Sequence, residues 1–153
     1  MNEYMNLAIK TAHSGMNKNE GGPFGAVIIN QNRDVISKGN NKVLKENDPT
    51  AHVEIVAKRN ACKKLNTYDL SNYTLYTSCE TCPMCLSAII WANIKNVYYG
   101  CTKEDAGNIG FRDDIIYNYL EEKNSNLINL NQIDREECIK LLEEYKKNNK
   151  IIY

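Results

Sequence analysis

The stretch YTLYTSCETCPMCLSAIIW, residues 73–91, carries the strongest structural and chemical signals in the chain. Its first five residues are mostly β-branched or aromatic and predict a strand over 73–77. Residues 84–91 are mostly apolar, and Pro83 stands where a helix tolerates proline best, at its first position. Between the strand and the helix, Cys79, Cys82 and Cys85 form two overlapping Cys-x-x-Cys pairs. The stretch therefore predicts a strand that runs almost directly into a helix, with a cysteine cluster at the junction.

The same alternation of helices and strands extends in both directions along the chain. Apolar periodicity predicts helices over 2–16, 51–65, 84–91, 113–121 and 134–147. Strands are predicted over 24–29, 35–39, 73–77 and 96–100, with a weaker one over 127–130. This order favours an α/β fold with a mixed five-stranded sheet. Because no repeat or linker divides residues 1–153, we expect a single domain.

Charge and hydropathy narrow the class of protein. Nineteen Lys and Arg residues balance nineteen Asp and Glu residues, so the formal net charge is zero. A protein that follows a phosphate backbone needs a basic excess or patch, so we expect no nucleic-acid partner. We expect no membrane span and no secretion signal, because no apolar run is long enough for either, and this favours the cytoplasm. Thiols stay reduced there, so clustered cysteines are expected to be metal ligands or catalytic groups.

Geometry favours Cys82 and Cys85 over Cys79 as metal ligands. Both fall in the first turn of the predicted helix, three positions apart and therefore on one face. The helix N-terminus also favours the thiolate form that binds a metal. His52, at the start of the helix predicted over 51–65, supplies a third ligand, and three protein ligands leave an open position on a catalytic zinc. If Cys79 were a fourth ligand, the site would be a closed structural zinc instead.

Glu54 lies two residues after His52, and positions two apart in a helix do not share a face. Glu54 is therefore not expected to bind the same metal directly. Beside a zinc with an open position, its carboxylate can act as a general acid and base. Without the metal ligands, Glu54 would simply be a solvated glutamate at a helix N-terminus.

His52-Val53-Glu54 followed by Thr81-Cys82-Pro83-Met84-Cys85 resembles the H-x-E…P-C-x-x-C signature of the cytidine-deaminase-like zinc deaminases. Two positions depart from the family's pattern. Thr81 stands where the family has proline, and Arg112 stands where an acidic residue is more usual. Longer matches resemble the bacterial guanine deaminases of that family; they are residues 21–28, 47–54, 75–80, 82–86 and 110–114 and the terminal Tyr153.

The resemblance implies a three-layer α/β/α sandwich, one zinc ion per chain and a small nucleobase as substrate. It implies hydrolytic deamination of guanine to xanthine and ammonia, with Glu54 and Asp113 as catalytic residues. It also implies a homodimer with exchanged C-terminal segments, in which the tail of one chain closes the pocket of the other. Asp114 is an alternative to Asp113. The substrate contacts that the resemblance implies are Asn41, Phe24, Trp91 and Tyr153. Without the resemblance, Asn41 would be expected to be a turn residue, and Phe24 and Trp91 would be expected to be core residues.

Other functions remain open from the sequence. A related deaminase acting on guanosine, cytosine or a tRNA adenosine would share the zinc site. A binding module with a structural zinc is a different class, but it would leave Glu54 without a role. A thiol–disulfide oxidoreductase would not need the distant His52-x-Glu54 motif.

Overall fold

The computed structural model describes residues 1–122 and 126–153. The chain divides into two compact units, Met1–Tyr117 and Asn118–Tyr153. Whether residues 1–153 act as one deaminase domain stays a prediction. No helix in the described ranges is both long and apolar enough to cross a membrane.

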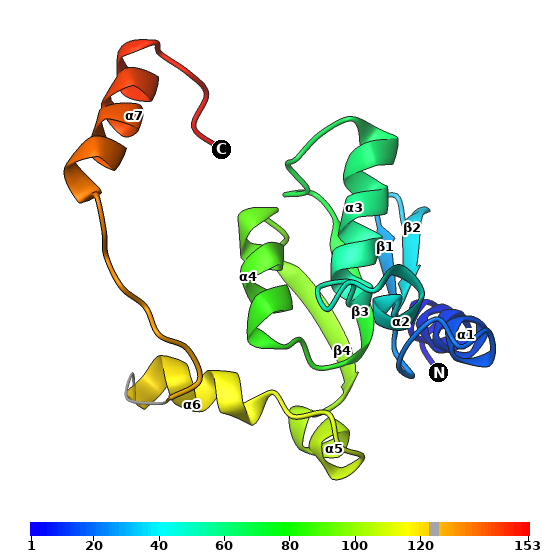
Figure 1. Ribbon diagram of the computed structural model, residues 1–153. Helices are drawn as coiled ribbons and strands as arrows, with labels where there is room; N and C mark the ends of the chain where they lie inside the picture. The colour runs from blue at the N-terminus through cyan, green and yellow to red at the C-terminus, as the bar shows by residue number, and fades with distance from the viewer. Residues whose placement is uncertain (123–125) are drawn as a thin grey trace. The chain divides into compact units, whose positions relative to one another are not determined.

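The first unit contains a mixed four-stranded sheet with helices on both faces (Figure 1). Its strands are β1 (Gly25–Ile29), β2 (Val35–Asn40), β3 (Thr74–Cys79) and β4 (Asn96–Cys101), in the order β2-β1-β3-β4. β1 pairs antiparallel with β2 and β3, and β3 pairs parallel with β4. The helices of this unit are α1 (Glu3–Asn17), α2 (Val43–Glu46), α3 (Val53–Leu65), α4 (Pro83–Trp91), α5 (Lys103–Asn108) and the first residues of α6 (Asp114–Glu122).

The residues of β1 are buried on both faces of the sheet. Successive side chains of a strand point to opposite faces, so alternate residues enter different cores. Ala26 and Ile28 pack with residues of α3, whereas Val27 and Ile29 pack with Tyr4 and other residues of α1. The expected layering of helix, sheet and helix is therefore observed in this unit.

Gly39 in β2 lets α3 lie directly on the sheet. A Cβ atom at this position would meet the carbonyl oxygen of Val53 at 2.5 Å and the amide nitrogen of Ala57 at 2.7 Å. Because both atoms belong to the helix backbone, no side-chain rotation could relieve such a contact. The distance between the sheet and the first turn of α3, which follows His52, therefore depends on glycine at position 39.

The second unit contains the end of α6 and α7 (Arg135–Lys147). The fifth strand expected over 127–130 is wrong, because no regular structure forms there and the described residues contain a four-stranded sheet. Leu127, Ile128 and Leu130 are more than half exposed. A strand gains stability from a paired neighbour and a buried face, and this apolar segment has neither a pairing strand nor a buried side.

Candidate active site

The N-termini of two helices bring the predicted zinc ligands together. His52 is the residue immediately before α3, and Cys82 is the residue immediately before α4, with Pro83 in the first helical turn. Cys85 follows in that turn, so its side chain lies beside that of Cys82. Thr81 in place of the family's proline leaves this arrangement intact.

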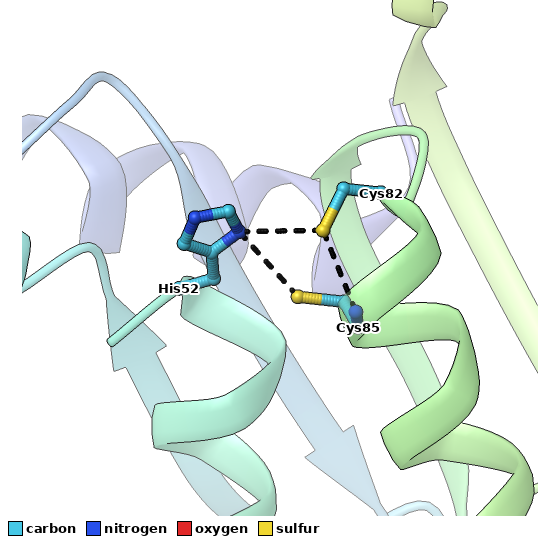
Figure 2. A group of neighbouring side chains, drawn as sticks. All are labelled: His52, Cys82 and Cys85. Atoms are coloured by element: carbon cyan, nitrogen blue, oxygen red, sulfur yellow. Dashed lines mark hydrogen bonds between the residues drawn. The ribbon is translucent and has the colours of Figure 1, made fainter. Parts of the chain in front are cut away.

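His52, Cys82 and Cys85 face one another (Figure 2). The Nδ1 atom of His52 lies 3.5 Å from the Sγ of Cys82 and 3.6 Å from the Sγ of Cys85. A tetrahedral zinc with Zn–N of about 2.0 Å and Zn–S of about 2.3 Å would place its nitrogen and sulfur ligands about 3.5 Å apart. The observed spacing therefore fits zinc, with Nδ1 as the ligand atom of the imidazole.

The charges of the two thiols also fit a divalent cation. Hydrogen bonding to Cys85 and His52 lowers the pKa of Cys82 to about 4, so Cys82 is a thiolate at neutral pH. The hydrogen bond between Cys85 and Cys82, burial and the charge of Cys82 raise the pKa of Cys85. The backbone N–H of Cys85 donates to the Cys82 Sγ at 3.4 Å. The structure thus holds one thiolate and one thiol, and a bound zinc would supply the positive charge that lets both sulfur atoms act as thiolate ligands.

Cys79 lies near the three ligands but has a different environment. Its thiol donates a hydrogen bond to the carbonyl oxygen of Thr102 at 3.7 Å, and burial raises its pKa to about 11. Among the described residues, the group able to hold a metal contains His52, Cys82 and Cys85 without Cys79. Three protein ligands are typical of a catalytic zinc rather than a closed structural one.

Glu54 points from the first turn of α3 toward β3. It is 6% exposed, and its Oε1 atom accepts a hydrogen bond from the Thr77 hydroxyl at 2.9 Å. Burial raises the pKa of its carboxyl group. Glu54 is therefore not a solvated surface residue but a buried acid beside the zinc ligands.

A pocket of about 480 Å³ opens next to these residues, within the first unit. Its lining includes the zinc ligands His52 and Cys82, the buried acid Glu54, and the predicted contacts Asn41, Phe24 and Asp113. Pockets of this size accommodate small ligands.

The two neighbouring aspartates have different surroundings. Asp113 lines the pocket, and partial burial, followed by the Cys82 charge, raises its pKa. Asp114 is exposed and accepts hydrogen bonds from the Arg112 guanidinium at 3.1 and 2.6 Å. Arg112, the departure noted in the sequence, therefore pairs with Asp114 and leaves the Asp113 carboxyl free to face a ligand.

Asn41 and Phe24 are held at the pocket by local contacts. Asn41 is buried, and its Oδ1 atom accepts a hydrogen bond from the Val43 amide at 3.1 Å, as in a turn. Its Nδ2 group is then the donor left for a ligand. Phe24 packs edge-on against Phe111, with the ring centroids 5.0 Å apart.

The other two predicted contacts lie elsewhere. Trp91 ends α4, at the opposite end of the helix from Cys82, is 72% exposed and does not line the pocket. The length of α4 separates it from the zinc ligands, and its packing on the base stays a prediction. Tyr153 belongs to the second unit, and its role stays a prediction.

The structure adds residues that sequence reasoning missed. Thr77 holds Glu54, Phe111 packs on Phe24, and Glu80 lines the pocket while accepting a hydrogen bond from the Lys103 amide at 2.9 Å. A signal for Thr77 was present, since strand alternation places this polar residue on the same face as Leu75. No comparable signal singles out Phe111 or Glu80.

Comparisons with known proteins agree with this geometry. The family profile described as the cytidine and deoxycytidylate deaminase zinc-binding region matches residues 1–101. Guanine deaminase from Bacillus subtilis (strain 168) is 47% identical over 119 residues, covering 78% of this chain and 76% of that protein. A tRNA-specific adenosine deaminase from Buchnera aphidicola subsp. Schizaphis graminum is 37% identical over 145 residues, covering 95% and 93%.

A solved structure extends the similarity to the fold. The X-ray structure of guanine deaminase from Bacillus subtilis matches with a TM-score of 0.90 and 41% identity. The match covers 100% of this chain and 99% of that one.

Proposed function

We infer the function from the premise that the chain belongs to the family of cytidine and deoxycytidylate deaminases, defined by their zinc-binding region. We propose that it is a zinc-dependent enzyme that hydrolyses guanine to xanthine and ammonia. The observation that carries this proposal is the buried Glu54 carboxyl group beside the His52, Cys82 and Cys85 zinc site, in a pocket of about 480 Å³. The similarity to Bacillus subtilis guanine deaminase supports guanine as the substrate.

Zinc with an open coordination position supplies a Lewis acid that makes water nucleophilic near neutral pH. Glu54 accepts one proton from the water and delivers it to a ring nitrogen, then takes the second proton from the new hydroxyl group and delivers it to the leaving amine. The water oxygen bonds to the carbon that carries the amino group, and the bond from that carbon to the exocyclic nitrogen breaks. Burial favours the protonated form of Glu54, so the carboxyl group can hold a proton between these two transfers.

The remaining pocket residues bind and orient the base. The Nδ2 group of Asn41 donates to the exocyclic oxygen of guanine, since its Oδ1 is already held by Val43. The Asp113 carboxyl accepts from the ring N–H or amino edge. The ring of Phe24, braced by Phe111, packs on the flat face of the base. Polar contacts of this kind discriminate between bases because a wrong base leaves them unpaired.

A tRNA adenosine deaminase is the second candidate, because the Buchnera aphidicola relative aligns with 95% of this chain. The balanced charge of the chain weighs against it, since tRNA binding needs a basic surface. The deciding experiment measures zinc content and ammonia release on guanine, guanosine, adenine, cytosine and cytidine, with inosine formation in tRNA scored alongside. Preferential turnover of guanine supports the proposal. Inosine formation without guanine turnover would establish the second candidate, and a zinc-loaded protein inert on every substrate would exclude both.

The active enzyme is proposed to be a homodimer with exchanged C-terminal segments, in which Tyr153 of one chain closes the pocket of the other. The second unit supports this proposal by exposing Leu141, Leu142, Ile151 and Ile152, which an interface would cover. Light scattering of the intact protein and of a truncation after Lys150 tests the idea. A monomeric active protein would contradict it. The cytoplasm is the proposed compartment, because reduced cysteines are needed for zinc binding.

A further inference from the structure

We propose that Thr77 is a positioning residue for catalysis: its hydroxyl holds one oxygen of Glu54 so that the other faces the reacting atoms. The inference rests on the proposed function, because it assigns Glu54 the proton transfers. Thr77 does not line the pocket, so it acts through Glu54 rather than on the base.

The position of the Thr77 hydroxyl is tightly constrained. Thr77 lies on β3, an inner strand, and its backbone is in register with Ala26 on one side and Tyr99 on the other. The residue is 0% exposed. A β-branched side chain has few χ1 rotamers, so the hydroxyl points in a direction set by the sheet.

The surroundings of Thr77 offer little other reason for a hydroxyl. Its neighbours on the same face of the sheet, Leu75 and Ala26, belong to a buried hydrophobic core. A hydroxyl buried in such a core is unfavourable unless it makes a hydrogen bond, and valine would fill the same space without that cost. The bond of 2.9 Å to Glu54 Oε1 satisfies the hydroxyl.

The hydrogen bond from the Thr77 hydroxyl fixes the position of the Glu54 Oε1 atom. Without it, the carboxylate would rotate about its side-chain torsions and leave the geometry needed for proton transfer.

The test compares the zinc-loaded Thr77→Val and Thr77→Ser variants with the intact protein on guanine. Thr77→Val is expected to keep zinc and a KM within about twofold, but to lower kcat about tenfold, as expected for loss of one hydrogen bond to a charged group. Thr77→Ser retains a hydroxyl and should restore most of kcat. Thr74→Val, on the same strand without a contact to Glu54, is the matched control and should leave kcat unchanged.

Crystal structures of the zinc-loaded intact protein and Thr77→Val keep this proposal separate from the proposed function. The carboxyl group of Glu54 should turn away from its original position in the variant. An unmoved carboxyl group overturns the role of Thr77, as does an unchanged kcat. Equal loss of kcat in the valine and serine variants, with loss of zinc, would show that Thr77 is merely structural. If the intact protein does not act on guanine, the proposed function fails while the carboxyl position still decides the role of Thr77.

Discussion

The Nδ1 atom of His52 lies 3.5 Å from the Sγ atom of Cys82, although 30 residues separate them in the chain. This contact joins the N-termini of α3 and α4, which pack on the same side of the sheet (Figure 1). The residue before each helix is extended, so its side chain projects beyond the helix end. Two helix starts placed side by side are thus enough to assemble an imidazole and a thiolate around a metal.

Zinc content should depend on two of the three clustered cysteines. We expect about one zinc per chain in the intact protein and in Cys79→Ser, and much less in Cys82→Ser and Cys85→Ser, because only the latter pair contributes ligands. Elemental analysis of the purified proteins measures this. Zinc loss in Cys79→Ser as severe as in Cys82→Ser would indicate a closed four-ligand site.

Replacing Glu54 with glutamine should separate metal binding from catalysis. The amide fits the same space but cannot carry the proton, so Glu54→Gln is expected to keep zinc and to lose about 10²–10⁴-fold in kcat. Ammonia release and elemental analysis on the same sample measure both properties. Near-normal turnover by a fully loaded Glu54→Gln protein would remove Glu54 from the mechanism.

Asp113, which lines the pocket, and its exposed neighbour Asp114 offer a matched pair of substitutions. Asp113→Asn should lower kcat/KM for guanine about 10–100-fold, because the proposed hydrogen bond to the base would lose its charged partner. Asp114→Asn should change kcat/KM little, since Asp114 is exposed and pairs with Arg112. Steady-state kinetics of both variants is the measurement. The opposite ranking would assign the contact to Asp114.

Gly21 holds the backbone against Asn41, and alanine there should disturb the binding site. A Cβ atom would lie 2.1 Å from Asn41 Oδ1 and 2.6 Å from its carbonyl oxygen. Gly21→Ala is therefore expected to raise KM for guanine and to destabilise the fold by about 1–3 kcal/mol. Gly107→Ala is the control, because a Cβ atom there has nothing within 4 Å. Thermal unfolding and KM should change in Gly21→Ala, and equal behaviour of the two variants would contradict the contact.

Phe24 and Trp91 are both predicted to pack on the base, but Phe24 lines the pocket and Trp91 does not. Phe24→Ala should raise KM for guanine about tenfold, in keeping with the loss of one base–aromatic contact. Trp91→Ala should leave the KM of the isolated chain within about twofold, because Trp91 is exposed outside the pocket. Steady-state kinetics of both variants, at a protein concentration at which the oligomeric state is the same, measures the two KM values. A larger effect for Trp91 would restore the expectation from the sequence.

The zinc site could be predicted because its signals are local. Pro83 marks the start of α4, and this places Cys82 and Cys85 in one turn before any long-range contact is known. His52 was then the histidine that could complete a set of three zinc ligands, and the family's motif contains the same residues. The contacts of Thr77 and Phe111 were missed because they depend on which residues the fold brings opposite one another. These tertiary neighbours cannot be predicted from a single sequence.

The incorrect or missing elements also have physical causes. Residues 127–130 have the composition of a strand, but strand formation needs a pairing partner that composition cannot supply. α5 is too short to show a helical period, although Thr102 and Asp105 form a capping box that marks its start. α2 is shorter still and lies in a segment rich in asparagine, which predicts turns.

The close approach of α3 to Gly39 has a consequence for how this site can vary. His52 stands at the end of a helix whose distance from the sheet is set by a missing methyl group, not by any metal ligand. Any larger residue at position 39 would push the helix outward and carry the imidazole away from the two sulfur atoms. The metal affinity of the protein therefore depends on Gly39, a residue without a side chain on β2. Gly39 is far from the cysteines along the chain and has no chemical role of its own.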